Sequence, residues 1–440
     1  MSLRPRLNTM PRSVPRPADR PRSAPGWLWV LVVAAVLTQT GVQLLRPVTS
    51  YQLLSFGYGE TEIGATTAVY AILPLVLAMP LGRATSVIGD IRWIMICGTV
   101  LLGAGGAVLG SATELIGVFA GSVLLGVGHL MFTLAGQSVV SRRSSATVMD
   151  LGFGLFTAAF SAGQMLGPFL SGLILGSRAE ASEITTALWV GSLLCFGAVP
   201  LLFGLRGSSS DQDSVARPRN EGDQRTQTGS LPISGTKPTA LRILRVPGIA
   251  SNMFAALAML AMIDILVAFM PLVGESLGVS PLVIGALLSA RGLASVISRV
   301  FLPIVTRHVY RNTVLIGAVG ISGIAVALVP VVLNDTAVGI VAAGVLISIG
   351  GVFLGLGQPL TMTQISQAVP LNWRSPALAL RLVGNRVGQV LIPLVAGLVA
   401  TPWGPAGGIW CASALLLVSA TERLGLRRWG PDPDECDRNN

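Results

Sequence analysis

Two similar stretches decide how this chain of 440 residues folds: GQMLGPFLSG at 163–172 and GQVLIPLVAG at 388–397. Both interrupt apolar runs with glycine and proline, which normally weaken a helix interior. They align at an offset of 225 residues, and a Gly-Gln pair at 136–137 recurs at 357–358, an offset of 221. Two paired segments in the same order indicate two duplicated halves. The alternative is chance similarity between glycine-rich apolar helices.

The composition places these stretches in a membrane. Hydrophobic residues make up 52% of the chain and charged residues only 11%, whereas about 25% of residues are charged in soluble domains. The mean hydropathy is +0.70. A large soluble core is the alternative, but a soluble fold has nowhere to bury so much apolar surface. The chain is therefore predicted to be an all-α integral membrane protein.

Apolar runs of about 20 residues, the length that crosses a bilayer, predict twelve transmembrane helices in two pseudo-symmetric six-helix bundles. The predicted spans are 28–55, 63–82, 93–112, 115–139, 151–176 and 185–205, then 248–273, 279–303, 313–333, 336–364, 377–400 and 405–424. The predicted segments are a disordered cytoplasmic tail at 1–26, a bundle at 27–205, a linker at 206–246, a bundle at 247–425 and a cytoplasmic tail at 426–440. The linker is polar and free of aromatic residues, as a flexible connection between two separately packed bundles would be.

Basic residues collect on one side of the predicted spans. The N-terminal tail carries six arginines, and the segment 206–245 carries six arginines and one lysine. The loops on the other side carry one basic residue, Arg178. The positive-inside rule therefore predicts that both termini and the linker are cytoplasmic and that the chain lies in the cell membrane. The net charge of +10 is expected to face anionic lipid head groups, and nucleic acid is not an expected partner.

The loop after the second span, PLGRATSVIGDIR at 80–92, resembles the loop signature of the major facilitator superfamily. The signature residues here are Gly82, Arg83, Gly89 and Arg92. Ser86 and Val87 stand where the family has an acidic and a basic residue, which puts in doubt the latch between bundles that this loop forms in the family. The alternative is an ordinary basic turn that serves only topology.

The fifth span is similar to the antiporter motif of the same family. Its motif residues are Gly154, Gly163, Gly167, Pro168 and Gly172. The resemblance covers about residues 27 to 425 and implies two bundles that rock about a central site, with proton-coupled export. Physically, Gly163 and Gly167 form a GxxxG face that permits close helix approach, and Pro168 permits a bend. Ordinary packing between neighbouring helices is the alternative and says nothing of direction.

Few charged residues lie within the predicted spans, and these are the candidates for proton and substrate binding. Asp264 is the only acid clearly inside a span, and the basic ones are Arg46, Arg291, Arg381 and Arg386. Each costs about 2.5–3.5 kcal/mol or more to insert, so they should face a cavity or each other. Asp264 and Arg291 lie at similar depth on adjacent helices, which predicts that they pair. The carboxylate is then proton-coupled or substrate-linked, or the pair is purely structural.

Surplus positive charge in the second half favours an anionic or carbonyl-rich substrate, because guanidinium offers a fixed fork of donors. Arg386, with the adjacent Asn385, and Arg46 are predicted cavity residues, and Arg46 is expected near the outer mouth of the cavity. Arg381 lines the cavity or, alternatively, snorkels toward the cytoplasm. His129 is expected to be a packing residue, with proton relay as the alternative.

Four glutamines have repeat symmetry and are predicted to make uncharged polar contacts or to bond helix to helix. They are Gln137, Gln164, Gln358 and Gln389. Gln164 and Gln389 belong to the repeated stretches and are counted among the cavity candidates.

The predicted function is proton-coupled export of a small organic compound, anionic or neutral, by alternating access. An importer of a small metabolite is one alternative, and a non-transporting membrane protein or membrane enzyme is another. The spans contain no paired carboxylates and no GxSxG or HExxH motif, and the four cysteines lack metal-ligand spacing. No enzyme activity, cofactor or metal is predicted. The expected partners are the substrate, protons and the lipid bilayer, and the chain is expected to be a monomer.

Overall fold

The computed structural model describes residues 26–143, 146–205, 239–370 and 373–427, and these residues form helices without any strand. The prediction of an all-α membrane fold is confirmed. The helices are α1 (Gly26–Ser55), α2 (Glu60–Val87), α3 (Arg92–Ser111), α4 (Leu115–Arg143), α5 (Ala146–Leu175), α6 (Ala181–Gly197), α7 (Val199–Phe203), α9 (Ala240–Leu244), α10 (Ile249–Ser276), α11 (Pro281–His308), α12 (Arg311–Val332), α13 (Ala337–Gln367), α14 (Arg374–Trp403) and α15 (Ala406–Arg427).

Among the described residues, eleven helices are long and apolar enough to cross a membrane, with α6 and α7 counted as one. The remaining long helix is α15, whose last two turns carry Glu422 and Arg423. The predicted terminal tails and most of the predicted linker lie outside the described residues. The short helix α9 falls within the segment predicted to be linker.

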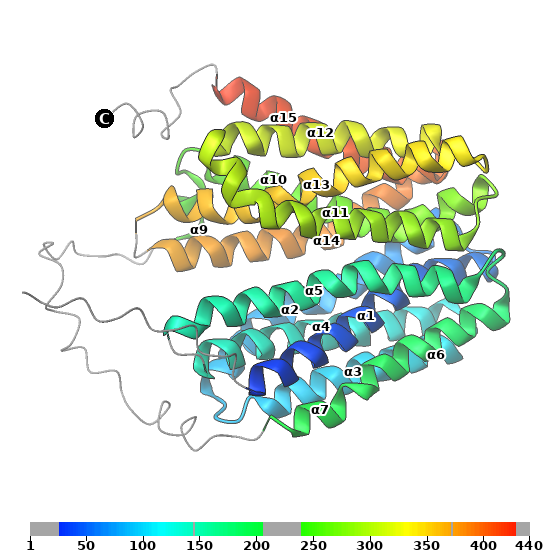
Figure 1. Ribbon diagram of the computed structural model, residues 1–440, viewed down its shortest axis with the longest axis horizontal. Coiled ribbons are helices and arrows are strands. Elements are labelled where there is room, and N and C mark those ends of the chain that lie inside the picture. The colour runs from blue at the N-terminus through cyan, green and yellow to red at the C-terminus, as the bar shows by residue number, and fades with distance from the viewer. Residues whose placement is uncertain (1–25, 144–145, 206–238, 371–372, 428–440) are drawn as a thin grey trace, which may run out of the picture.

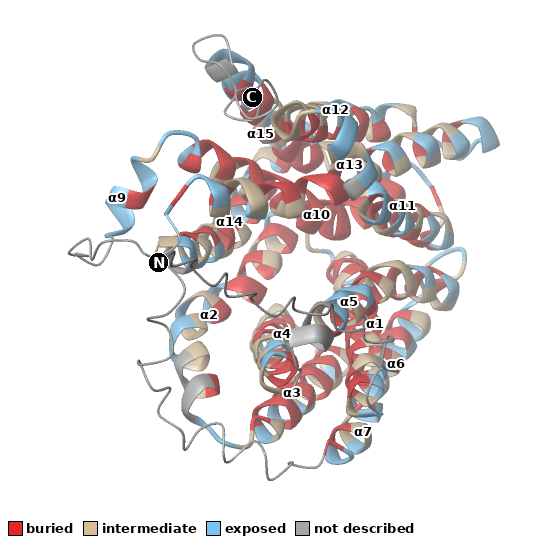
Figure 2. Ribbon diagram, turned by 60° about the vertical axis from the view of Figure 1, so that its left-hand side comes forward, coloured by how far each residue is buried: buried red, intermediate tan, exposed pale blue. Residues whose placement is uncertain are grey.

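The long helices form two groups, α1 to α7 and α10 to α15, which we call the first and the second bundle (Figures 1 and 2). Successive helices run in opposite directions, so the described chain begins and ends at the same end of the molecule. We call this end the termini side, and the opposite end, at the right of Figure 1, the far side. The bundles lie closest to each other at the far side.

The helices α1 and α10 are the most buried. In their apolar windows 67% and 78% of residues are buried, against 33% to 56% in the other spans. A helix that is apolar on all faces is stable only when it is surrounded by other helices or by lipid. The polar side chains that these two helices carry are therefore held between neighbouring helices.

Two glycines position the far-side loops that lead into the contact between α5 and α11. Gly176 follows α5 with φ of 60°, and Gly278 follows α10 with φ of 67°. This left-handed conformation commonly ends a helix and suits glycine because it has no Cβ. Leu282 at the start of α11 donates its backbone N–H to the carbonyl of Gly176 at 3.2 Å, so the second bundle bonds to the first at this turn.

Candidate transport site

The first seam between the bundles is the packing of α5 against α11. A Cβ placed on Gly285 of α11 would clash with the carbonyl oxygen of Pro168 and would lie 2.9 Å from Cα of Gly172. Glycine at position 285 therefore lets the two backbones touch. Further along, Arg299 Nη1 donates to Ser161 Oγ at 3.2 Å.

The second seam is the packing of α2 against α14, and it repeats this geometry. A Cβ on Gly64 would clash with the carbonyl oxygen of Pro393 and would lie 3.0 Å from Cα of Gly397. Thr61 and Thr401 hydrogen-bond through their hydroxyls at 2.9 Å. The Pro-x-x-x-Gly element of each repeated stretch thus accepts a glycine from the other bundle.

Both seams lie toward the far side. In the described part of the chain, their hydrogen bonds and close glycine contacts involve residues 161–176 of α5 and its turn and residues 60–64 of α2, and an apolar cluster extends the second seam to Leu75. Toward the termini side, Gly82 in α2 and Gly154 in α5 have nothing within 4 Å of an added Cβ. The structure is therefore closed at the far side.

The GxxxG face of α5 serves a different contact. A Cβ on Gly167 would lie 2.5 Å from Cβ of Gln43, and one on Gly163 would clash with Gln39, both in α1 of the same bundle. The predicted close approach is confirmed for these two glycines. Of the other two glycines of the motif, Gly172 lies in the first seam and Gly154 has nothing within 4 Å of an added Cβ.

An ion pair connects the two bundles at the centre. Arg46 Nη2 in α1 lies 2.7 Å from Asp264 Oδ1 in α10, and their side chains are 13% and 5% exposed. The predicted pair between Asp264 and Arg291 is wrong. Two residues at the same depth on adjacent helices can still point in different directions. Asp264 faces α1, whereas the backbone of Arg291 packs on Gly351 of α13. Arg46 is also not at the outer mouth, since it lies nine residues before the end of α1.

The carboxylate of Asp264 has a second partner in the repeated stretch of α14. Gln389 Nε2 donates to Asp264 Oδ2 at 2.8 Å, and Arg386 Nη1 donates to Gln389 Oε1 at 3.0 Å. Both residues were predicted for the cavity, and the structure joins them to the acid. Asn385 is buried and its Oδ1 has no partner among the described residues. The Gln164 side chain, which occupies the corresponding position in α5, makes no hydrogen bond within that part of the chain.

On the other side of the ion pair lies Tyr70, which the sequence analysis missed. The Arg46 guanidinium lies 5.0 Å from the centre of the Tyr70 ring, within the range of a cation–π contact. The Tyr70 hydroxyl is 2.5 Å from His129 Nδ1, and the His129 ring stacks on Phe160. His129 is bonded and packed, as expected, and a polar chain runs from it through Tyr70 and Arg46 to Asp264. A tyrosine at mid-span was the available signal, because its buried hydroxyl needs a partner.

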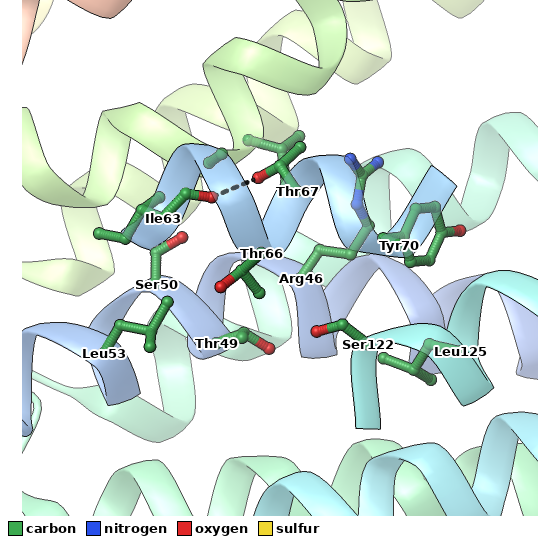
Figure 3. Close-up of a pocket in the computed structure, with 12 residues that line it drawn as sticks. Arg46, Thr49, Ser50, Leu53, Ile63, Thr66, Thr67, Tyr70, Ser122 and Leu125 are labelled. Atoms are coloured by element: carbon green, nitrogen blue, oxygen red, sulfur yellow. Dashed lines mark hydrogen bonds between the residues drawn. The ribbon is translucent and has the colours of Figure 1, made fainter. Parts of the chain in front are cut away.

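A small cavity of about 30 Å³ lies beside the ion pair (Figure 3). It is lined by Arg46, Thr49, Ser50, Leu53, Ile63, Thr66, Thr67, Tyr70, Ser122, Leu125, Val267 and Ala268. Such a volume holds about two water molecules, whereas sites for organic ligands measure about 300–1,000 Å³. In this closed arrangement the space beside Arg46 therefore suits water or protons and excludes an organic substrate.

The other arginines inside the helices differ in their partners. Arg381 is 7% exposed and donates to Thr361 Oγ1 at 3.2 Å, so it does not snorkel. Arg423, which was not among the candidates although it lies in the predicted span 405–424, donates to Asn252 Oδ1 at 2.9 Å. Arg291 is 1% exposed, and its Nε and Nη1 have no partner in the described residues.

The residues around the loop signature make their polar contacts within the first bundle. Arg142 Nη1 at the end of α4 donates to the carbonyl of Ile88 at 3.0 Å, and Arg92 pairs with Asp90 at 3.1 Å. An added Cβ on Gly89, like one on Gly82, has nothing within 4 Å. The side chain of Arg83 lies outside the described residues. No group of three or more His, Cys, Asp or Glu that could hold a metal occurs in the part of the chain that the structure describes.

Comparisons with known proteins agree with this architecture. The family model described as Major Facilitator Superfamily matches residues 31–375 and 253–435. An uncharacterized MFS-type transporter of Methanocaldococcus jannaschii is 21% identical over 147 residues, which cover 33% of this chain and 38% of that protein. Efflux pump patC of Aspergillus clavatus is 24% identical over 165 residues, which cover 37% of this chain and 30% of the pump. The matches thus span less than two fifths of either relative.

Among solved structures, the nucleoside transporter NupG superposes with a TM-score of 0.70 at 13% sequence identity. The superposition covers 91% of this chain and 97% of NupG. At this level of identity the similarity establishes the fold alone.

Proposed function

Since the chain belongs to the Major Facilitator Superfamily and is a transporter of that family, we propose that it exports a small organic compound in exchange for protons. The observation that carries this proposal is the ion pair between Arg46 and Asp264, which joins the two bundles at 2.7 Å. Asp264 is the proton-binding group in this scheme. Arg46 holds it when it is charged.

The proposed coupling follows from the position of the pair between the bundles. In transporters built from two repeats, the bundles rock about a site near the midplane. Protonation of Asp264 removes its charge and with it the attraction to Arg46, so that only the glycine seams hold the bundles together. Loss of one partner of a buried ion pair typically costs about 3–5 kcal/mol, which is enough to shift an equilibrium between two bundle arrangements. For exchange, the proton binds Asp264 from the outside while the far side is open and the substrate leaves, and its release to the cytoplasm restores the pair and the far-side closure.

The proposed direction relies on topology and on relatives. With both termini in the cytoplasm of the cell, as the distribution of basic residues predicts, the far side is extracellular and the structure is closed to the outside. Substrate then enters from the cytoplasm. The antiporter-like pattern in α5 and the similarity to an efflux pump support export over import.

The test uses inside-out membrane vesicles with a fluorescent pH reporter and compares three proteins. These are the wild type, Asp264→Asn and the control Glu275→Gln, which neutralises an exposed acid at the far end of the same helix. Lipophilic acids and neutral drugs are added one at a time to vesicles that carry a proton gradient. We expect a substrate-triggered proton leak in the wild type and in Glu275→Gln, and its loss in Asp264→Asn with normal protein abundance.

Two outcomes would overturn the proposal. A leak of wild-type size in Asp264→Asn would remove Asp264 from proton coupling. Uptake of a radiolabelled compound without any proton movement in the wild type would make the protein an uncoupled transporter.

A further inference from the structure

Among the described residues, Arg291 is the one strongly buried arginine whose guanidinium lacks a protein acceptor at two of its three nitrogens. It is 1% exposed, and neither Nε nor Nη1 has a hydrogen-bond partner within the described residues. The comparable buried arginines, Arg381 and Arg423, each bind a side-chain oxygen on a neighbouring helix. Buried donors in native structures are nearly always satisfied, so an exception of this kind requires an explanation.

Within the part of the chain that the structure describes, no carboxylate is left near Arg291 to satisfy it. Asp264 is close enough for its charge to act on Arg291, but its two oxygens already bind Arg46 and Gln389. The other charges that act on Arg291 are Arg46 and Arg299, and both are positive. Arg299 lies on the same helix, and its Nε is likewise without a partner in the described chain. Among the described residues, the positive charges near Arg291 therefore outnumber the single carboxylate, Asp264.

An uncompensated guanidinium inside a membrane helix is costly, by at least about 2.5–3.5 kcal/mol on insertion scales. Packing alone does not require it, since an apolar side chain of similar volume is often neutral or stabilising at such a position. The missing acceptor is thus an anionic oxygen that the protein itself does not supply. Guanidinium binds carboxylate and phosphate groups with charge-assisted hydrogen bonds.

We propose that Arg291 binds the oxyanion group of the transported compound, so that the substrate is a small organic anion bearing a carboxylate or a phosphate. This inference rests on the proposed function, because it assigns the substrate class of that transport site. Gly292, the next residue, packs on the backbone of Gln164 across the α5–α11 seam. Separation of the two helices at this point gives a ligand a route to Arg291, which the closed seam covers.

The test measures ligand binding to the full chain, purified in detergent in a Tris chloride buffer, by the shift of its unfolding temperature. The probes are benzoate, hexanoate and phenylphosphonate, each compared with its uncharged amide. The variants are Arg291→Gln, Arg291→Lys and the control Arg423→Gln, which alters a buried arginine with a protein partner. Since Arg291→Gln removes an unpaired charge, we expect it to fold at least as stably as the wild type.

At least one anion should raise the unfolding temperature of the wild type and of Arg423→Gln, while its amide should not. Loss of a charge-assisted hydrogen bond should weaken the apparent affinity of Arg291→Gln roughly ten- to a hundredfold, and Arg291→Lys should fall between. If Arg291→Gln fails to fold, the same ordering must hold between the wild type and Arg291→Lys. Equal anion stabilisation of the wild type and the Arg291 variants overturns the proposal, and so does stabilisation by the amides alone or by none of the probes.

The same assay on Asp264→Asn separates this inference from the proposed function. No proton gradient is present in detergent, so binding is measured whether or not protons are exchanged. If anion binding in detergent depends on Arg291 but Asp264→Asn vesicles leak protons as the wild type does, the anion site stands and only the role of Asp264 in proton coupling is overturned. If the proton leak depends on Asp264 but Arg291→Gln binds the anion as well as the wild type does, the anion site is overturned and the proton coupling stands.

Discussion

The two repeated stretches, 163–172 in α5 and 388–397 in α14, have one face in common and differ on the other. On the common face, Pro168 and Pro393 each present a carbonyl oxygen to a glycine of the opposite bundle. This contact closes the far side twice, once in each seam. This contact is formed by backbone atoms and contains no titratable group. The position at which the two bundles meet is therefore independent of pH.

The two stretches differ on the face that each turns toward helices of its own bundle. Gly167 touches the backbone of α1, whereas the corresponding residue of α14 is Ile392. Gln164 makes no side-chain hydrogen bond in the described chain, whereas Gln389 binds Asp264. One copy is therefore a rigid packing element and the other supports the titratable group. The difference suggests that closure and proton control reside in separate parts of a duplicated fold.

The largest loss of transport is expected when a glycine of either seam is replaced by valine. Gly285→Val and Gly64→Val place a side chain where even a Cβ would meet a backbone carbonyl, so neither seam can close. Transport should fall to background in both variants while the protein remains in the membrane. The readout is a disulfide between Thr61→Cys and Thr401→Cys, whose hydroxyls lie 2.9 Å apart in the native seam. Efficient cross-linking in Gly64→Val would contradict the proposed role of that glycine.

The next effect concerns the charged link. Arg46→Gln leaves the buried Asp264 without its ion-pair partner, and we expect a loss of about 3–5 kcal/mol in stability. Arg46→Gln combined with Asp264→Asn removes both charges and should recover much of this loss. Denaturant unfolding in detergent of the two single variants and the double variant gives the coupling energy. Additive losses would mean that the two charges do not interact.

A smaller effect separates the glutamines of the two copies. Gln389→Leu removes a donor to the Asp264 carboxylate, worth about 1.5–3 kcal/mol for a charged acceptor. Its transport should therefore drop roughly tenfold or more. Gln164→Leu breaks no side-chain hydrogen bond seen in the described residues and should stay close to wild type. Equal losses in initial transport rates would show that the copies are functionally alike.

The smallest effect is expected at Gly154. An added Cβ there meets nothing within 4 Å, and alanine is favoured over glycine in a helix by roughly 0.5–1 kcal/mol. Gly154→Ala should leave transport unchanged and slightly raise the unfolding temperature. Lost transport with an intact fold would show that Gly154 approaches another helix in a different bundle arrangement.

The sequence predicts the fold and the seam elements well, for physical reasons. Hydropathy over about 20 residues fixes membrane spans because the bilayer sets the length, and glycine with proline in an apolar run has few roles other than close backbone contact. The repeat at an offset of 225 therefore predicted close helix contact in both stretches, but it did not predict that Pro168 and Pro393 meet glycines of the opposite bundle.

The partners of the charges were harder to predict. Helix rise gives depth, but the partner depends on which face of α10 meets α1 across the bundle boundary. Sequence neighbours favoured Arg291 on the adjacent span, whereas the ion pair joins residues 218 positions apart. Arg299 and Arg423 lie inside the predicted spans 279–303 and 405–424 but were not among the candidates, and both bond to residues of other helices.

The most direct test of the link between Asp264 and far-side closure is a distance measurement between spin labels across the first seam. The labels are placed at Ser177→Cys and Leu277→Cys, both exposed, after replacement of the native cysteines, in protein reconstituted in lipid. Acidification should lengthen the distance in the wild type, because a protonated Asp264 releases Arg46. Asp264→Asn should show the long distance at every pH. The same pH response in both proteins would contradict the account.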